Sequence, residues 1–212
     1  MSSSSLPSVP RSYPYLHSGV RDAARTAVFL DWGFVERSVR SELGVDAAAF
    51  DLDPTKLATE LVTHRKWASG LSATAILDGI HDRNRRPGDY LRATSRAQRW
   101  AAAVNTTVHL HPLQYLPSGE FRQKQVDVEL ALQMVEAARS GNCDAIIVFT
   151  GDGDLLPAAK RVVAEGVRFE SACWGYRSGL RVPEVKHWTH NLDIEVFRRI
   201  ATPRHYRCRG GV

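Results

Sequence analysis

Four aspartates stand at places where a parallel β-sheet would direct them toward one crevice. Asp31 ends the apolar run TAVFLDW, residues 26–32, and Asp152 and Asp154 follow a second apolar run, residues 145–149, in the turn TGDGD. Asp127 lies at or near the start of the helical sequence that leads into this second run. Ligands of open parallel sheets bind beyond the carboxyl ends of the strands, so acids at these places are candidates for chemistry.

Converging carboxylates without a cationic partner would repel one another and raise one another's pKa values. A divalent cation removes that cost, and ligands that offer only oxygen suit Mg²⁺ or Mn²⁺ better than zinc. Such an ion can activate a water for in-line attack on a phosphodiester. We therefore expect a set of acids to act both as metal ligands and as catalytic residues, namely Asp31, Asp127, Asp152 and Asp154.

Each of these acids also has a purely structural interpretation. Asp is a favoured helix N-cap and turn residue, and Asp152 or Asp154 taken singly is more often a cap than a ligand. Asp127 near a helix start could simply complement the helix dipole. The conjunction of the four favours the metal site. Asp78 ends another apolar run, LSATAILDG, but could equally begin the following turn, so we place it at the rim of the site.

Other chemistries find less support. No G-x-S-x-G turn is present, and TGDGDLL lacks the Gly-Lys-Ser/Thr of a P-loop, which argues against a serine hydrolase and an NTPase. His109 and His111 alternate along one strand face with no third metal ligand at a suitable spacing. Cys143, Cys173 and Cys208 form no C-x-x-C pair and are too few for a disulfide framework.

The charge of the chain is compatible with a polyanionic partner. The net charge is +5 and the sequence pI is about 9.3, although so small an excess could equally serve solubility. Arginines gather in HDRNRRPGDYLRATSRAQR, where Arg83, Arg85 and Arg86 lie in an expected loop that could track phosphates. Lys124 is a further candidate for phosphate contact or simply an exposed lysine. Thr150 is a candidate for hydrogen bonding to a metal ligand, to a water or within its own turn.

Alternating strands and helices must position these residues. Apolar runs predict strands over residues 26–32, 71–79, 106–113, 145–149 and 167–174, and helical spacing predicts helices over residues 35–43, 54–67, 90–104, 124–141 and 155–165. The helix over 124–141 has apolar residues on nearly every face, so we expect it to be largely buried. The alternation indicates an α/β fold, a three-layer α/β/α sandwich around a mainly parallel sheet of about five strands.

A chain of 212 residues favours one domain. We expect a flexible, Ser- and Pro-rich arm over residues 1–24, the α/β domain over residues 25–200, and a flexible basic tail over residues 201–212. No apolar run is long enough to cross a membrane, and no signal-peptide pattern is present. We therefore expect a soluble, cytoplasmic protein without a membrane partner.

Three blocks of the sequence resemble the signature blocks of the NYN domain, a branch of the PIN-like superfamily: VFLDW, KQVDVELALQM and AIIVFTGDGDLLPAAKRVVAEGVRFE. The resemblance covers roughly residues 26–200 and is most specific in K-x-x-D-V followed by a strand and S/T-G-D-x-D. It implies a PIN-like, Rossmannoid parallel sheet, a Mg²⁺ or Mn²⁺ site, and endoribonuclease activity on single-stranded or structured RNA. It also implies catalytic roles for Asp31, Asp127, Asp152 and Asp154.

One position departs from this pattern. Such domains usually place Asn three residues after the first Asp, where this chain has Phe34, a change that could weaken catalysis, shift the substrate or signal a binding role. The leading hypothesis is RNA hydrolysis that leaves a 5′-phosphate and a 3′-hydroxyl, with the loop arginines on the RNA backbone. The alternative is a non-catalytic RNA-binding or adaptor module on the same fold. A nuclease acting on DNA, and assembly as a homo-oligomer, stay open.

Overall fold

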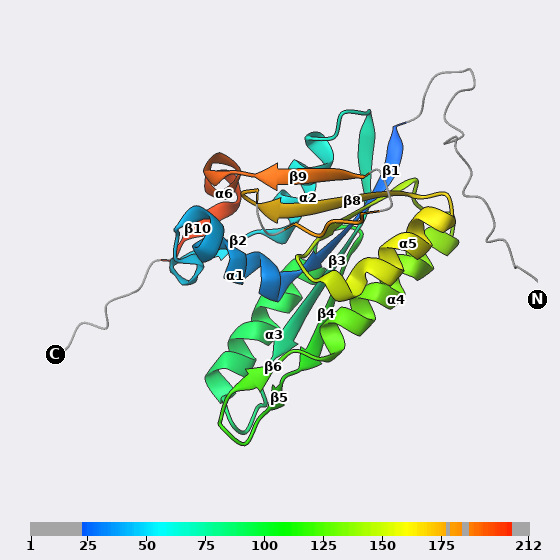
Figure 1. Ribbon diagram of the computed structural model, residues 1–212. Coiled ribbons are helices and arrows are strands. Elements are labelled where there is room, and N and C mark those ends of the chain that lie inside the picture. The colour runs from blue at the N-terminus through cyan, green and yellow to red at the C-terminus, as the bar shows by residue number, and fades with distance from the viewer. Residues whose placement is uncertain (1–22, 177–178, 184–186, 205–212) are drawn as a thin grey trace, which may run out of the picture.

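The computed structural model describes residues 23–176, 179–183 and 187–204 (Figure 1). Its centre is a six-stranded sheet in which every pair of neighbouring strands is parallel. The strand order is β4-β3-β1-β7-β8-β9. The bounds of these strands are β1 Ala24–Asp31, β3 Ser69–Ile80, β4 Thr106–Pro112, β7 Ala145–Phe149, β8 Arg168–Trp174 and β9 Trp188–Leu192.

Helices cover both faces of this sheet. They are α1 Trp32–Leu43, α2 Pro54–Thr63, α3 Pro87–Ala101, α4 Gln125–Arg139, α5 Leu156–Ala164 and α6 Ile194–Ile200. Figure 1 shows α4 and α5 side by side on one face, with α1, α2 and α6 on the other. Two small antiparallel pairs lie outside the main sheet, β2 Phe50–Leu52 with β10 Ala201–Pro203 and β5 Gln114–Tyr115 with β6 Phe121–Arg122.

The apolar runs form central strands because both of their faces are buried. In β1, Val28 and Leu30 pack into the core beneath α1, α2 and α6, whereas Ala27 and Phe29 pack into the core beneath α4 and α5. Successive side chains of a strand point to opposite faces, so a strand between two helical layers must be apolar at nearly every position. Each fully buried Val, Leu or Phe side chain contributes about 1.5–3 kcal/mol to this arrangement.

The strand order places a topological switch point between β1 and β7. From β1 the chain moves outward through β3 to β4, and it then returns to the centre and moves outward the other way through β7, β8 and β9. The connections that leave the carboxyl ends of β1 and β7 therefore diverge. A crevice opens at such a point in parallel sheets, so the end of β1 and the turn after β7 are the places to look for a site.

The three-layer α/β/α architecture and the parallel sheet confirm the prediction, while several details differ. The sheet has six strands rather than about five, because β9 was not predicted. The helix expected over 90–104 begins at Pro87, since proline fits the first turn of a helix, so the expected loop is shorter. The helix expected over 54–67 ends at Thr63, and β3 begins at Ser69, two residues before its predicted start.

The expectation that α4 is largely buried was wrong. Val128 and Leu132 expose 62% and 54% of their surface, because α4 forms the outer layer on its side of the sheet. Only one stripe of the helix faces the core, and its residues recur every four positions: Val126, Leu130, Met134 and Ala138. This spacing is that of an ordinary surface helix.

Part of the two predicted terminal segments belongs to the folded domain. Ala24 begins β1, and Ala201–Pro203 pairs with β2, while most of the predicted arm and tail, and Cys208, lie outside the described residues. The domain boundaries therefore stay a prediction. Cys143 and Cys173 are both buried. Among the described residues, no helix is both long and apolar enough to cross a membrane.

Candidate active site

Asp31 connects the end of β1 to the start of α1. Its Oδ1 caps the helix by accepting a hydrogen bond from the backbone N–H of Phe34 at 3.0 Å, and its Oδ2 accepts one from the Thr150 hydroxyl at 3.4 Å. Only 4% of the residue is exposed. Burial raises the pKa of Asp31 to about 6, with a smaller contribution from Asp127 in the same direction. The carboxylate is thus held in place but weakly solvated.

The turn after β7 fixes a second acid close to the first. Thr150 is fully buried, and its Oγ1 also accepts a hydrogen bond from the backbone N–H of Asp152 at 3.2 Å. The Asp152 carboxylate accepts one from the N–H of Asp154 at 2.9 Å, which caps the short 3₁₀ helix Gly153–Leu155. Thr150 therefore positions acids and is too buried to contact a substrate. The capping role considered for Asp152 is real, but it does not keep Asp152 out of the cleft described below.

Asp127 approaches from the first turn of α4. Burial raises its pKa, and the negative charge of Asp152 raises it further, as does that of Asp154 to a lesser extent. The positive charge of Arg37 lowers the pKa values of both Asp127 and Asp31. Asp127 therefore lies within electrostatic reach both of Asp31 at the end of β1 and of the two acids in the turn after β7.

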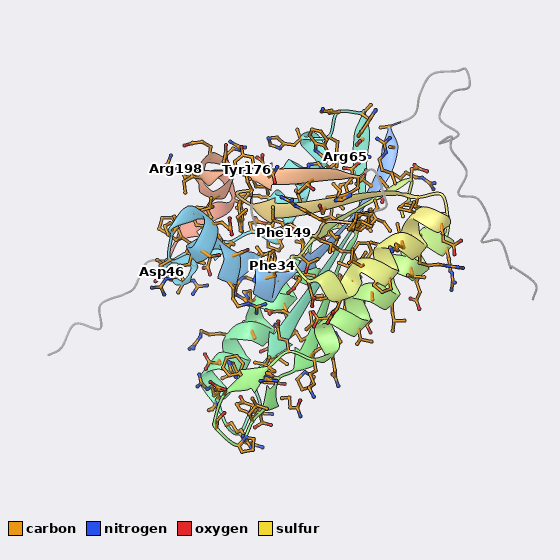
Figure 2. All side chains as sticks on the ribbon, in the orientation of Figure 1. Phe34, Asp46, Arg65, Phe149, Tyr176 and Arg198 are labelled. Atoms are coloured by element: carbon orange, nitrogen blue, oxygen red, sulfur yellow. The ribbon has the colours of Figure 1, made fainter. Side chains whose placement is uncertain are left out.

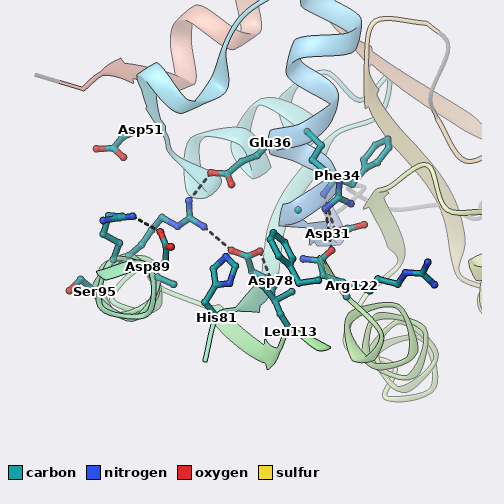
Figure 3. Close-up of a pocket in the computed structure, with 18 of the residues that line it drawn as sticks. Asp31, Phe34, Glu36, Asp51, Asp78, His81, Asp89, Ser95, Leu113 and Arg122 are labelled. Carbon is teal, nitrogen blue, oxygen red and sulfur yellow. Dashed lines mark hydrogen bonds and ion pairs between the residues drawn. The ribbon is translucent and has the colours of Figure 1, made fainter. Parts of the chain in front are cut away.

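A cleft of about 1390 Å³ contains these acids at the carboxyl ends of the strands (Figure 3). Asp31, Asp127 and Asp152 line it, whereas Asp154 is exposed and does not. None of the predicted phosphate-binding residues Arg83, Arg85, Arg86 and Lys124 lines it. Its basic residues come instead from α1, α3, β6 and the segment after β10, and are Arg37, Arg92, Arg96, Arg99, Arg122 and Arg204.

Half of these arginines are neutralised by neighbouring carboxylates. Arg92 pairs with Asp89, and Arg204 with Asp51 at 2.9 Å. Arg96 bridges two acids, and Figure 3 draws its bonds to both of them. The other three, and the three acids, have no ion-pair partner within 4.0 Å among the described residues: Arg37, Arg99, Arg122, Asp31, Asp127 and Asp152.

Asp78 differs from the other acids because it has a cation. It lies within β3, one residue beyond the strand partner of Asp31, and it is 6% exposed. Burial raises its pKa to about 6 against the opposing effect of Arg96, which donates to Asp78 at 2.7 Å and to Glu36 at 2.6 Å. Asp78 thus lies in the wall of the cleft as part of an ion-pair network.

The acids suit a divalent cation in their chemistry, although they do not form a finished cage. Within residues 23–176, 179–183 and 187–204, no group of three or more His, Cys, Asp or Glu side chains is arranged to hold a metal ion. Mg²⁺ usually keeps several waters and takes only one or two carboxylates from the protein. A buried carboxylate without a cation, Asp31, near two further acids therefore fits such an ion.

Sequence reasoning missed the arginines that line the cleft and also Gln123. Arg37 lies on α1, and its Nη1 donates to the side-chain oxygen of Gln123 at 3.3 Å. The Gln123 side chain fills the space above Gly33 and Gly79, where an added Cβ would lie 2.7 and 2.9 Å from its amide nitrogen. The sequence gives no sign that Gln123 belongs to the site. Gln123 reaches the cleft only because the segment after β6 folds back toward it.

Phe34 lines the cleft with a hydrocarbon ring. The ring packs against Phe149 of β7, with 6.1 Å between centroids, and both side chains lie near the middle of the molecule in Figure 2. This position therefore contributes packing to the site but no hydrogen-bonding group.

Comparisons with known proteins identify the family and support the fold. A family model described as the NYN domain matches residues 25–178. The crystal structure of a protein of unknown function from Vibrio parahaemolyticus is similar, with a TM-score of 0.54 and 15% sequence identity over 84% of this chain and 96% of that chain. At this identity the likeness concerns the fold alone. The comparison with curated proteins gave no match.

Proposed function

This chain belongs to the NYN domain family, whose members are PIN-like and generally nuclease-like, and we propose that it is a metal-dependent endoribonuclease. One observation carries the proposal. The cleft at the switch point of the sheet keeps three carboxylates and three guanidinium groups without ion-pair partners in the described part of the chain. A cation-binding site beside an anion-binding surface is what phosphodiester hydrolysis requires.

Asp31, Asp127 and Asp152 are the residues that would hold Mg²⁺ or Mn²⁺, with Asp154 close enough to add negative charge. When bound, such an ion supplies a polarised phosphoryl oxygen and a more acidic water. The protein's own part is to fix the acids. Thr150 orients Asp31, and the capped turn orients Asp152.

The unpaired arginines would hold the substrate. Arg37 is close enough to Asp31 and Asp127 to lower their pKa values, so a phosphate that it binds would lie beside the acids. Arg99 and Arg122 line the same cleft and would hold neighbouring phosphates by charge-assisted hydrogen bonds. We propose RNA rather than DNA as the substrate on the basis of the family alone, since guanidinium groups that bind phosphates do not distinguish ribose from deoxyribose.

The direct test is cleavage of an end-labelled RNA with Mg²⁺ or Mn²⁺. Activity is expected to disappear in EDTA and to fall to that background in Asp152→Asn, with products that carry a 5′-phosphate and a 3′-hydroxyl. Asparagine caps a helix about as well as aspartate, so this variant should keep its fold. Asp46→Asn is a matched control, because Asp46 caps the 3₁₀ helix Ala47–Ala49 outside the cleft.

Equal cleavage by the parent and Asp152→Asn would reject the proposal. Metal-independent, salt-sensitive RNA binding without turnover would instead favour the alternative, a binding or adaptor module, to which Phe34 also points. A DNA strand of the same sequence in a parallel assay decides whether the substrate is RNA.

A further inference from the structure

A group of three aromatic side chains, His81, Tyr115 and Phe121, lies where the β5–β6 hairpin meets the loop after β3. We name it the hairpin aromatic cluster. The Tyr115 hydroxyl and His81 Nδ1 are 2.8 Å apart, and the rings of His81 and Phe121 meet edge to face with 4.7 Å between centroids. His81 and Phe121 line the same cleft as the acids, while Tyr115 supports them from behind.

Phe121 is an aromatic side chain in the cleft with 45% of its surface open. It lies on a strand of two residues, and a hairpin this short has little stability of its own. The aromatic contacts therefore hold the hairpin in place, yet they leave one ring of the cluster facing solvent. The open part of this ring can stack on a planar partner.

Cations surround the cluster. The Arg85 guanidinium lies 4.6 Å from the Tyr115 ring centroid, and that of Arg86 lies 6.0 Å from the Phe121 ring centroid. Arg122 follows Phe121 directly, is exposed, and has no carboxylate partner among the described residues. Arg85 and Arg86, expected from the sequence to contact phosphate, thus border the cleft at the cluster instead of lining it.

Arg86 pairs with Asp89 at 3.6 Å, so Arg122 is the guanidinium beside Phe121 that is open to an anion. An exposed ring beside such a cation is the combination that binds single-stranded nucleic acid. Bases stack on the ring while the cations hold the phosphates. In a duplex the faces of each base are covered by its neighbours, so this mode selects unpaired bases. Burial lowers the pKa of His81, so its ring is neutral near neutral pH and adds flat, uncharged surface to the cluster.

We propose that the hairpin aromatic cluster binds one unpaired nucleobase of a single-stranded nucleic acid, stacked on Phe121, with Arg122 on the adjoining phosphate. The inference rests on the proposed function, because the cluster shares its cleft with the acids. It makes the hairpin the element that selects single strands over duplexes.

The test measures binding in EDTA, so that cleavage does not enter. Labelled single-stranded RNA, DNA of the same sequence, and the RNA duplex are titrated against the parent and against Phe121→Ala, Phe121→Leu and Phe121→Trp. Loss of one stacked base is expected to weaken single-strand binding about 5- to 100-fold in the Ala and Leu variants, and Trp is expected to preserve it. Leu91→Ala is the matched control, since Leu91 is an exposed apolar residue that lines the cleft from α3.

Leucine keeps apolar volume without a flat ring, so parent-like binding by Phe121→Leu would overturn the proposal, as would parent-like binding by Phe121→Ala. An equal loss of single-strand and duplex binding would also overturn it. A loss seen with RNA, DNA or both supports stacking and identifies the strand that is bound. If the Phe121 variants bind weakly but the parent never cleaves RNA, the stacking site is supported and the nuclease proposal is rejected. If the parent cleaves RNA but Phe121→Ala binds normally, the nuclease proposal stands and the stacking site is rejected.

Discussion

The carboxylate of Asp31 and the hydroxyl of Thr150 join the carboxyl ends of the two central strands, with 3.4 Å between their oxygen atoms. The same hydroxyl accepts a hydrogen bond from the backbone N–H of Asp152. One buried oxygen atom therefore orients two candidate metal ligands that are 121 positions apart in the chain. Positioning in this site therefore depends on a side chain that never touches solvent.

Thr150→Val should impair catalysis more than it impairs folding. Valine has nearly the same shape but leaves Asp31 Oδ2 without its donor and the Asp152 N–H without its acceptor. Hydrogen bonds to charged groups contribute about 1.5–3 kcal/mol, so we expect kcat to fall about tenfold or more. Cleavage rates at saturating RNA, together with thermal unfolding, measure the two effects. Thr150→Ser keeps the hydroxyl and should recover most of the rate; a serine variant as slow as the valine variant would contradict the assignment.

Arg96→Met should destabilise the protein strongly. Arg96 is the cation shared by Asp78 and Glu36, and Asp78 has only 8% of its side chain exposed. Removing one partner of a buried ion pair leaves an uncompensated charge, so the free energy of unfolding should fall by about 3 kcal/mol. Urea titration gives this value. Arg198→Met, which removes an exposed pair with Glu195, should cost at most about 1 kcal/mol, and similar losses in the two variants would refute the role of Arg96.

Gly79→Ala should disturb the entrance to the hairpin. An added Cβ would lie 2.4 Å from a methyl carbon of Leu113 and 2.9 Å from the Gln123 amide nitrogen. Both atoms end flexible side chains that must move aside, so we expect a loss at or below the lower end of the roughly 1–3 kcal/mol that overpacking costs. Gly70→Ala, in the same strand β3, meets no atom within 4 Å and is the natural control. Unfolding midpoints of both variants test the idea, and an unaffected Gly79→Ala protein would show that the space above Gly79 is not filled.

Stability should depend on pH through Glu170, which is fully buried between Arg65 and His190. Burial alone would raise the pKa of Glu170, but hydrogen bonds from His190 and Arg65 outweigh it and hold the pKa below the usual value of 4.5. A group whose pKa is lower in the folded state stabilises the fold above its unfolded pKa, and this contribution is lost as the pH falls below that value.

Glu170→Gln should therefore be less stable than the parent near neutral pH, by about 3 kcal/mol, and the difference should shrink as the pH falls from about 5 to 3. Urea unfolding across this range provides the comparison, with Glu195→Gln as an exposed control. A difference that stays constant with pH would mean that Glu170 contributes packing alone.

Much of the fold was predictable because its signals are local. The strands β1 and β7 are unbroken apolar runs, which is what burial on both faces demands. β9 was missed because its sequence, WTHNL, mixes exposed and buried positions, and its buried polar residue is explained only by a distant partner. His190 is compatible with the core because its Nε2 meets the Glu170 carboxylate at 2.8 Å. No pattern within five residues carries that information.

The acids of the site could be predicted from local sequence, whereas the arginines could not. Asp31 and Asp152 follow apolar strands, so their place at the switch point can be read from the sequence, and the structure brings both to one cleft with Asp127. Which arginines line that cleft depends on the direction of α3 and the path of the hairpin. Arg99 and Arg122 could therefore not be distinguished in advance from the arginines of the neighbouring loop.

Asp31 uses its two oxygen atoms for different ends: Oδ1 caps α1, and Oδ2 faces Thr150. Asparagine can still cap α1 with its side-chain oxygen, but it lacks the negative charge of the carboxylate. Alanine provides neither the cap nor the charge. A lineage could thus abandon the chemistry proposed for this cleft by a single change to asparagine and still inherit an intact fold. Descendants that had traded cleavage for recognition would be expected to carry asparagine, more often than a small apolar residue, at this position.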